Sequence, residues 1–401
     1  MRKKLLQINV TANWGSTGKI AEQIGMLAMQ QGWESYVAYG RMMNPSKSKL
    51  IKIGCQLDVY VHYVMGKFLD MEGLVSRRAT RKLVKEIERI KPDVVHLHNI
   101  HGHYLNYPIL FEYLASQNIP VVWTLHDQWA TTGHCHFNTV GCERWKSGCF
   151  DCPVKEKYGL DKSERNYDLK RSYFTSLNNT TIVTVSDWLK FQIEQSYLGK
   201  FPIKVIKNGV DTDVFKPQLT DIRSKYGIGC NKIILGVASA WIKGKGLEDF
   251  KKLKERLPEG WVIVLVGSLQ EGKIPSDIIH VERTQNQMEL AQLYTSANVV
   301  ASLSSSETFG LTIAEGMACG TPAIVYNNTA LPELVDTNTG AIVEQGDIDG
   351  IIESLKSFEN KTESISKACR ERAMNYFNQT NSFDSYIRLY GELIGGGTLF
   401  C

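Results

Sequence analysis

The sequence predicts an α/β fold with two domains, each built on a parallel β-sheet that helices cover on both faces. The chain has 401 residues, which is too long for one ordinary hydrophobic core and fits two. Short apolar runs alternate with stretches of helical character along the whole chain. Because the runs are apolar on both faces, they are typical of buried parallel strands that helices connect.

The apolar runs form two series, which a turn-rich segment at residues 208–217 separates. We therefore predict a first domain at residues 1–204, a second at 205–374, and a final segment at 375–401 with apolar residues at helical spacing. Both domains are expected to be Rossmann-like, and because such sheets bind ligands beyond the carboxyl ends of their strands, two facing domains would enclose a cleft. The predicted strands are residues 5–10, 35–39, 94–98, 121–125 and 182–185, then 233–237, 261–266, 299–303 and 323–326.

Composition narrows the classes of partner. Hydrophobic residues make up 43% of the chain and charged residues 22%, and the net charge is +4. This charge is too mild to indicate nucleic acid as a partner. No run approaches the roughly 18 apolar residues of a membrane helix, and polar residues interrupt the N-terminal apolar stretch before a signal-peptide core can form. We expect a cytoplasmic protein without a transmembrane segment, with peripheral contact at the inner face of the membrane as a further expectation.

Two glutamates, Glu307 and Glu315, stand eight positions apart after the predicted strand at 299–303. A loop containing Gly310 and a helix starting near Leu311 lie between them, so free backbone N–H groups and the positive end of the helix dipole suit a phosphate. The two carboxylates suit hydroxyl groups beside that phosphate. Glu315 can bridge two vicinal hydroxyl groups with its two oxygens. Together these features indicate a nucleotide sugar. A surface helix with two solvated glutamates is the alternative.

This segment resembles the E-x7-E signature of the retaining glycosyltransferases of family 4, which have the GT-B fold. The similarity includes Phe309, Gly310 and Leu311 and extends to the Ala-Cys-Gly-Thr-Pro sequence at residues 318–322. The resemblance implies transfer of a sugar from a nucleotide-diphosphate donor to an acceptor hydroxyl, with retention at the anomeric carbon and no cofactor required for catalysis. It also implies that the final helix, residues 375–401, crosses back onto the first domain. In this family Glu307 would hold the donor sugar and Glu315 the ribose.

A glycine turn follows the first predicted strand. Residues 13–19 contain Gly15 and Gly18, but Asn13 and Ile20 occupy the places where a P-loop needs glycine and a hydroxyl residue. The turn still brings backbone N–H groups close to a ligand. In the family the equivalent loop faces the donor diphosphate and the acceptor, which indicates Gly15 and Gly18. A purely structural tight turn is the alternative.

Histidines collect after two predicted strands of the first half. His126 stands at the carboxyl end of the strand at 121–125, where it can hydrogen-bond a sugar hydroxyl while Asp127 or the backbone fixes its tautomer. It matches the strand-end histidine of the family, which makes it a catalytic candidate. The histidine-rich segment at residues 96–103 is interpreted as structural or acceptor-side rather than as a catalytic metal site.

Lys245 follows the predicted strand at 233–237, and a lysine there suits the negative charge of a leaving diphosphate. Lys245 matches the Lys-Gly sequence of the family, but Ala240 stands where the family has an arginine. We expect Lys243 or another residue to supply the second positive charge. A solvated surface lysine is the alternative for Lys243.

Four of the nine cysteines, Cys135, Cys142, Cys149 and Cys152, fall within an insertion at residues 133–153. The C-x2-C spacing of the last two is typical of a zinc site. A structural Zn2+ held by the four thiolates is one expectation, and cytosolic thiols packed in a loop are the alternative. Four filled ligand positions would exclude a catalytic role for this ion.

The predicted function is therefore sugar transfer to a saccharide or lipid-linked saccharide, by analogy in bacterial surface polysaccharide or lipopolysaccharide biosynthesis. A basic group, Arg77, Arg78, Arg81 and Lys82, would approach anionic lipid, with a solvated helix face as the alternative. Two other functions stay open on the sequence alone. One is a nucleotide-sugar epimerase or hydrolase of the same fold, and the other is a non-catalytic, zinc-stabilised binding protein.

Overall fold

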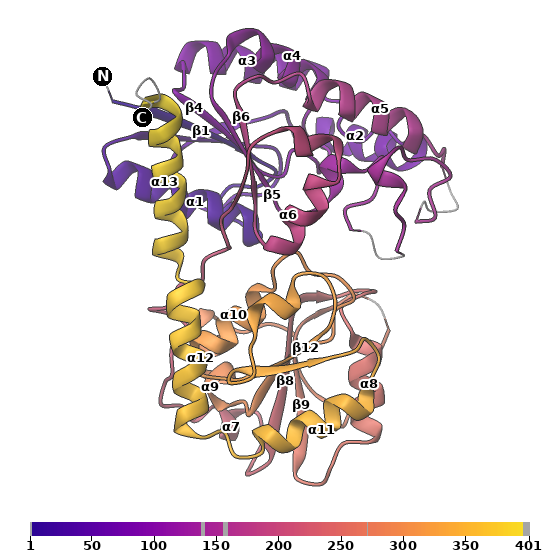
Figure 1. The fold of residues 1–401 in the computed structure, drawn as a ribbon, viewed down its shortest axis with the longest axis vertical. Coiled ribbons are helices and arrows are strands. Elements are labelled where there is room, and N and C mark those ends of the chain that lie inside the picture. The colour runs from indigo at the N-terminus through magenta and orange to yellow at the C-terminus, as the bar shows by residue number, and fades with distance from the viewer. Residues whose placement is uncertain (1, 138–140, 155–158, 271, 396–401) are drawn as a thin grey trace. The chain divides into compact units, whose positions relative to one another are not determined.

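The computed structural model describes residues 2–137, 141–154, 159–270 and 272–395. The chain forms two compact units, residues 1–206 with 383–401 and residues 207–382 (Figure 1). Each unit contains one parallel sheet with helices, so the predicted α/β class is confirmed. Residues 138–140 of the predicted insertion and 396–401 of the final segment lie outside the described residues.

The first unit contains a seven-stranded sheet in the order β3-β2-β1-β4-β5-β6-β7. All neighbouring strands pair in parallel. The order reverses direction between β1 and β4, which is the position where doubly wound sheets bind ligands. The strands are β1 (Lys4–Asn9), β2 (Glu34–Tyr39), β3 (Lys49–Lys52), β4 (Val94–Leu97), β5 (Val121–Leu125), β6 (Thr180–Thr184) and β7 (Ile203–Val205).

In the described part of the first unit, six helices connect these strands, and two of them begin at residues whose side chains satisfy free N–H groups of the first turn. The Asn106 side chain accepts from Ile109 N, and the Ser186 side chain accepts from Leu189 N. The helices are α1 (Gly15–Gln30), α2 (Gln56–Leu69), α3 (Arg77–Ile90), α4 (Tyr107–Gln117), α5 (Ser163–Phe174) and α6 (Asp187–Glu194), with short 3-10 turns at Trp129–Thr131, Arg144–Lys146 and Tyr197–Lys200.

The second unit contains a six-stranded parallel sheet in the order β10-β9-β8-β11-β12-β13. Here the order reverses between β8 and β11. The strands are β8 (Lys232–Trp241), β9 (Trp261–Leu269), β10 (Ile279–Val281), β11 (Val299–Ser302), β12 (Ala323–Tyr326) and β13 (Gly340–Val343). The helices are α7 (Ile222–Lys225), α8 (Leu247–Glu255), α9 (Gln287–Ser296), α10 (Leu311–Ala318), α11 (Ile348–Phe358) and α12 (Glu363–Tyr376), with a 3-10 turn at Leu331–Leu334.

Helix α13 (Gln379–Gly395) ends the described chain, and from Phe383 onward it belongs to the first unit. Its apolar residues recur at the spacing of one helical face. They join the core formed by α1 and the central strands, which also contains Leu5, Ile24 and Val94. The residues that α13 contributes to this core are Phe383, Tyr386, Ile387, Leu389 and Tyr390.

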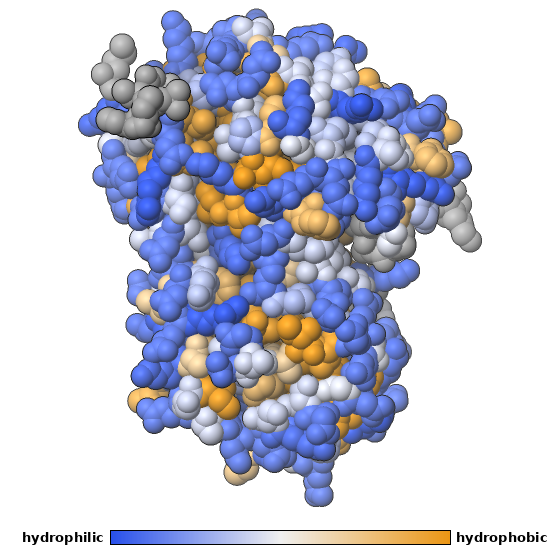
Figure 2. All heavy atoms as spheres, viewed as in Figure 1, coloured by the Kyte–Doolittle hydropathy of each residue, from blue (hydrophilic) through white to orange (hydrophobic). Residues whose placement is uncertain are grey.

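The face of the molecule in Figure 2 carries hydrophilic residues over most of its area, with smaller hydrophobic areas among them. Such scattered apolar residues are normal on protein surfaces. Within the described ranges, no helix combines the length and the apolar character that crossing a membrane requires.

Candidate active site

The candidate donor site lies where the strand order of the second sheet reverses. Two loops leave the carboxyl ends of the neighbouring strands β8 and β11, one at residues 242–246 and the other at residues 303–310. Ser305 N donates to Gly244 O at 2.9 Å, which ties the loops together. Parallel pairing of β8 with β11 therefore brings together residues about 60 positions apart in the sequence.

Lys245 and Glu307, one from each loop, form an ion pair. The distance from Lys245 Nζ to Glu307 Oε1 is 2.6 Å, and the two side chains are 32% and 23% exposed. This partial exposure leaves both groups accessible to a ligand while reducing the screening of their charges by water. The Glu307 backbone is fixed as well, because Glu307 N donates to Thr329 Oγ1 at 2.9 Å and Ala330 N donates to Glu307 O at 3.2 Å.

Gly246 sets how closely the two loops approach. Its φ is +82°, in the left-handed region, and a Cβ atom there would lie 2.3 Å from Leu303 O. No side chain fits this space without moving the backbone. The glycine after Lys245 therefore fixes the position of the lysine against the neighbouring loop.

Helix α10 begins immediately after Gly310, which has φ +102°. Glycine has no side chain to cap the helix, so the N-terminal end of α10 suits an anion, although Ile313 N already donates to Gly310 O at 3.1 Å. Leu311 is the first residue of α10 and is partly buried. Phe309 is 3% exposed and packs on Phe377 with ring centroids 5.7 Å apart, so its backbone rather than its ring can face a ligand.

Glu315 lies within α10 and accepts a hydrogen bond at Oε2 from Tyr294 Oη at 3.0 Å. Tyr294 is fully buried, and burial, followed by the charge of Glu315, raises the pKa of its phenol well above the usual value. The phenol therefore stays protonated and holds one carboxylate oxygen of Glu315 in place.

Lys243 is exposed and lines a cavity of about 360 Å³ next to the same loops. Gly244, Gly246 and Ser305 line this cavity too. Lys243 therefore lies on the side of the loop where a charged ligand can enter.

Sequence reasoning missed the contribution of the loop after β12. Asn328 Nδ2 donates to Ser304 O at 3.1 Å, and Thr329 accepts from the Glu307 backbone. The available signal was the polar sequence Asn327-Asn328-Thr329 directly after a buried parallel strand, at the same edge of the sheet.

In the first unit, the glycine turn follows β1. Gly15 starts α1 with φ +65°, and a Cβ on Gly18 would lie 2.6 Å from Thr11 Oγ1. Asn13 N donates to Gly18 O at 3.1 Å, which closes the turn. A side chain at position 18 would have to displace the Thr11 hydroxyl, which favours glycine in this turn.

His126 directly follows β5 and is partly buried. Its Nε2 lies 3.2 Å from His98 Nδ1, and His98 Nε2 lies 3.1 Å from Gln7 Oε1. Gln7 Nε2 donates to Ala21 O, so Gln7 Oε1 must accept from His98 Nε2–H, and His98 Nδ1 then accepts from His126 Nε2–H. Burial, opposed in part by Asp127, lowers the pKa of His126 to about 4. His126 is therefore a neutral imidazole whose Nδ1 is the acceptor nitrogen.

His98 Nδ1 contacts His126 Nε2, a partner that the sequence did not predict. Asp127 Oδ2 lies 2.8 Å from His101 Nε2 and 3.8 Å from His136 Nδ1. Burial acts to raise the pKa of Asp127, but the two histidines hold it well below the usual range. The side chains of consecutive residues at the end of a strand point in different directions, which explains why His126 and Asp127 have different partners.

His96 connects the sheet to α13. Its Nδ1 lies 2.6 Å from Tyr390 Oη and its Nε2 lies 2.8 Å from Thr124 Oγ1, which itself donates to Tyr386 Oη at 3.1 Å. Burial lowers the pKa of His96 well below its usual value, so the ring is neutral and structural.

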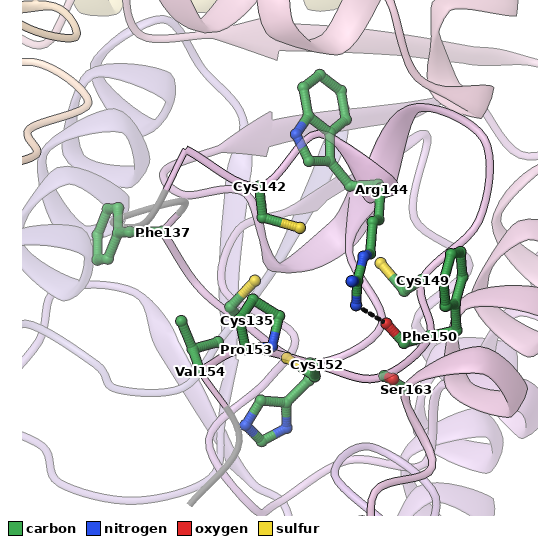
Figure 3. Close-up of a pocket in the computed structure, with 12 residues that line it drawn as sticks. Cys135, Phe137, Cys142, Arg144, Cys149, Phe150, Cys152, Pro153, Val154 and Ser163 are labelled. Atoms are coloured by element: carbon green, nitrogen blue, oxygen red, sulfur yellow. Dashed lines mark hydrogen bonds between the residues drawn. The ribbon is translucent and has the colours of Figure 1, made fainter.

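The four cysteines of the insertion line one small cavity of about 20 Å³ (Figure 3). The sulfur atoms of Cys135, Cys142 and Cys149 turn toward its interior. A cavity of this volume has room for about one water molecule or one ion. Burial raises the pKa of Cys149 to about 11, so without a metal this thiol stays protonated at neutral pH.

Comparisons with known proteins identify the class. A family model described as Glycosyltransferase Family 4 matches residues 25–214, and one described as Glycosyl transferases group 1 matches residues 220–376. The WcaC protein of Escherichia coli K12, named as a colanic acid biosynthesis glycosyl transferase, is 24% identical over 374 residues, covering 88% of this chain and 90% of WcaC. The capsular polysaccharide biosynthesis glycosyltransferase CapM of Staphylococcus aureus is 28% identical over 236 residues, covering 54% of this chain and 62% of CapM.

Solved structures share the fold. Sucrose-phosphate synthase from Thermosynechococcus elongatus superposes with a TM-score of 0.75 at 16% identity, covering 99% of this chain and 100% of that structure. Anabaena HepE, solved with UDP and glucose, gives a TM-score of 0.69 at 15% identity, covering 98% and 100%. The fold is therefore that of the GT-B glycosyltransferases. The two family models and the relatives are those of glycosyltransferases, and the resemblance found in the sequence is confirmed.

Proposed function

We propose that this glycosyltransferase transfers a sugar from a nucleotide-diphosphate donor to a hydroxyl of a saccharide acceptor, with retention at the anomeric carbon. The observation that carries the proposal is the ion pair between Lys245 Nζ and Glu307 Oε1, 2.6 Å apart at the reversal point of the second sheet. A cation and a carboxylate side by side suit a ligand with an anionic diphosphate next to a hydroxyl-rich ring. The first N–H groups of helix α10 are further hydrogen-bond donors for the diphosphate.

Each group of the donor site has a proposed role in the transition state. Negative charge grows on the leaving diphosphate, and Lys245 with the start of α10 at Gly310 and Leu311 stabilises it. Positive charge grows on the sugar ring, and Glu307 supports it while holding sugar hydroxyls. Glu315, held by Tyr294, binds the ribose. Lys243 supplies the second positive charge in place of the arginine that Ala240 replaces.

The first unit provides the acceptor side. His126 accepts a hydroxyl hydrogen bond at Nδ1 because its Nε2–H is committed to His98. Gly15 and Gly18 present backbone next to the ligand. The names of the relatives, colanic acid for WcaC and capsular polysaccharide for CapM, support an acceptor that belongs to surface polysaccharide biosynthesis.

A ligand screen followed by product analysis tests the proposal. A nucleotide-diphosphate sugar should raise the melting temperature, because a ligand that binds only the folded state stabilises it. UDP-glucose is the first probe, since HepE was solved with UDP-glucose in a related fold. Incubation of the donor with and without saccharide acceptors then separates transfer from epimerisation or hydrolysis, which need no acceptor. If no nucleotide-diphosphate sugar shifts the melting temperature, the proposed donor site is refuted.

We also propose that α2 places the enzyme on an anionic membrane surface within the cytoplasm, where a lipid-linked acceptor would lie. Leu57, Tyr60, Val61 and Phe68 share one face of α2 and are 67%, 64%, 44% and 49% exposed. Large apolar side chains on one exposed helix face are typical of interfacial helices. His62 of α2 hydrogen-bonds Ser76, directly before α3, whose first turns contain the basic residues Arg77, Arg78, Arg81 and Lys82.

Cosedimentation with anionic phospholipid vesicles tests the membrane proposal. The double variant Tyr60→Asp/Phe68→Asp should lose binding, because two charges on this face oppose insertion. Phe191→Asp is the matched control, since Phe191 is also exposed, at 61%, but lies on α6. If the α2 double variant still binds the vesicles, the proposed role of this helix is refuted.

For the cysteine cavity we propose a structural Zn2+ held by Cys135, Cys142, Cys149 and Cys152. Zinc would displace the thiol protons and offset the cost of burying the thiolates. Ligand sulfurs around zinc lie about 3.8 Å apart, so zinc binding requires the four sulfur atoms to take this spacing. Metal analysis should give zinc in the wild type, one zinc ion fewer per chain in Cys149→Ser/Cys152→Ser, and no change in Cys55→Ser, which alters an exposed cysteine. If the double variant holds as many zinc ions per chain as the wild type, this site is refuted.

A further inference from the structure

A second group of potential metal ligands lies in the first unit, apart from the four cysteines. His101 follows β4, Asp127 follows β5, and His136 lies in the insertion. One ligand atom from each, His101 Nε2, Asp127 Oδ2 and His136 Nδ1, lies within 4.8 Å of the other two. Three separate chain segments therefore bring two imidazoles and one carboxylate to a single point.

The separations of these atoms suit one divalent ion. Asp127 Oδ2 is 2.8 Å from His101 Nε2 and 3.8 Å from His136 Nδ1. Ligand atoms around a tetrahedral zinc lie about 3.3 Å apart, given bonds of roughly 2.0 Å to nitrogen and oxygen. The two distances lie on either side of this value, so small side-chain rotations would bring all three atoms to an ion.

Contacts behind the ligands already fix their orientation. Asp127 Oδ1 accepts from Trp129 N at 2.9 Å, which leaves Oδ2 directed at the histidines. Gln128 N donates to His136 O at 2.8 Å, which holds the His136 backbone beside β5. Such outer contacts are the usual support of metal-binding carboxylates and histidines.

The surroundings allow an ion to enter. The side chains of His101 and Asp127 are 14% and 12% exposed, whereas His136 is 48% exposed. His136 lines a cavity of about 280 Å³, which His103, His134 and Glu72 also line. Water from this cavity can fill the coordination positions that three protein ligands leave open.

A neighbouring triad, His62, Glu72 and His103, satisfies the same distance criterion but suits a metal less well. His62 Nε2 accepts from Gly73 N at 3.0 Å, and His62 Nδ1 lies 2.8 Å from Ser76 Oγ. Both ring nitrogens of this buried histidine are therefore committed to the protein, and metal binding would cost a hydrogen bond.

We propose that His101, Asp127 and His136 bind one divalent transition-metal ion, Zn2+ or a substitute such as Co2+. Imidazole and carboxylate ligands together favour such ions. The ion would join the insertion to the loops after β4 and β5, next to His126. This site is distinct from the cysteine cavity, and its occupation does not depend on sugar transfer.

Cobalt titration of the full-length chain tests the proposal. The protein is first stripped with a chelator, and the Cys149→Ser/Cys152→Ser background removes thiolate ligands. In that background one Co2+ should still bind, with visible absorption bands but without the sulfur-to-cobalt charge-transfer bands of thiolate sites. His136→Ala should weaken this binding at least about 10-fold, since loss of even an outer partner of a metal ligand costs 10- to 100-fold.

His134→Ala is the matched control, because His134 lies in the same loop but pairs with Asp70 at 3.0 Å. It should leave cobalt affinity unchanged. If the cysteine variant does not fold, the stoichiometry of the wild type gives the same answer: two Co2+ per chain, falling to one in His136→Ala. Absence of cobalt binding outside the cysteine cavity, or binding that His136→Ala does not weaken, would overturn the proposal.

Discussion

At the scale of single residues, the donor site depends on a cation and an anion that the protein holds together. Lys245 and Glu307 are 62 positions apart, and each is plausible as a surface residue when read alone. The sequence predicted both as site residues through the family motif, but their direct pairing follows from the adjacency of β8 and β11. No pattern within either segment contains that information.

Kinetics of two substitutions test the proposed roles of the pair. Lys245→Ala and Glu307→Ala should each lower kcat on the order of 10²-fold or more, because each removes a preorganised charge from the transition state. Lys252→Ala is the control, since Lys252 also forms an ion pair in the second unit, with Asp249 at 2.9 Å, but is 62% exposed. Near-native turnover in both site variants would contradict the assignment.

Gly246 provides a stability prediction. Gly246→Ala should destabilise the protein by more than about 1 kcal/mol, because alanine at positive φ is strained and its Cβ would also meet Leu303 O. Gly260→Ala separates these causes, since Gly260 has φ +79° but nothing within 4 Å of its added Cβ. Urea unfolding should show a larger loss for position 246 than for position 260, and equal losses would exclude the clash.

At the scale of secondary-structure elements, α13 shows how a buried polar network can join a helix to a sheet. Its apolar stripe was visible in the sequence, whereas its hydrogen bonds to His96 and Thr124 were not. The polar tips of Tyr386 and Tyr390 are buried, so each requires a partner inside the protein. His96 and Thr124, on adjacent strands, provide these partners.

Removing one hydroxyl tests this network. Tyr390→Phe should cost about 1–3 kcal/mol, because it leaves His96 Nδ1 buried without a donor. Tyr376→Phe, at a side chain that is 60% exposed, should change stability by less than about 0.5 kcal/mol. Chemical denaturation of both variants measures the difference. A Tyr390→Phe protein as stable as the wild type would show that the hydroxyl is not needed for docking α13.

The strands that sequence analysis missed share one property. β3, β7, β10 and β13 are three or four residues long and lie at sheet edges. Edge strands are short and partly exposed, so they lack the continuous apolar run of a central strand. The buried central strands have such a continuous apolar run, and the sequence therefore predicted them.

At the scale of the whole molecule, buried neutral histidines link stability to pH. Burial lowers the pKa of His62 and His126 to about 4 and that of His96 and His98 well below the usual value. Between pH 6.5 and 4 the unfolded chain therefore binds more protons than the folded chain. It follows that these groups make stability rise with pH across this window, and that the contribution is lost as pH falls.

The free energy of unfolding, measured by urea titration between pH 4 and 8, should thus fall below pH 6.5. Each histidine that charges only on unfolding adds a slope of up to about 1.4 kcal/mol per pH unit. The buried carboxylates Glu72 and Asp127 act in a lower window, because their depressed pKa values matter only below the ordinary carboxyl range. Stability that stays constant from pH 6.5 to 4.5 would contradict buried neutral histidines.

The sequence by itself determined the α/β class, the two series of buried strands and the resemblance to glycosyltransferases, because periodicity, turn residues and the glutamate motif are local properties. The tertiary structure decided which side chains meet. Asp127 pairs with His101 and His136, and Lys245 pairs with Glu307. The physical reason is that parallel strands place the carboxyl ends of distant segments at one edge, so contacts there depend on strand order and register rather than on neighbours in the chain.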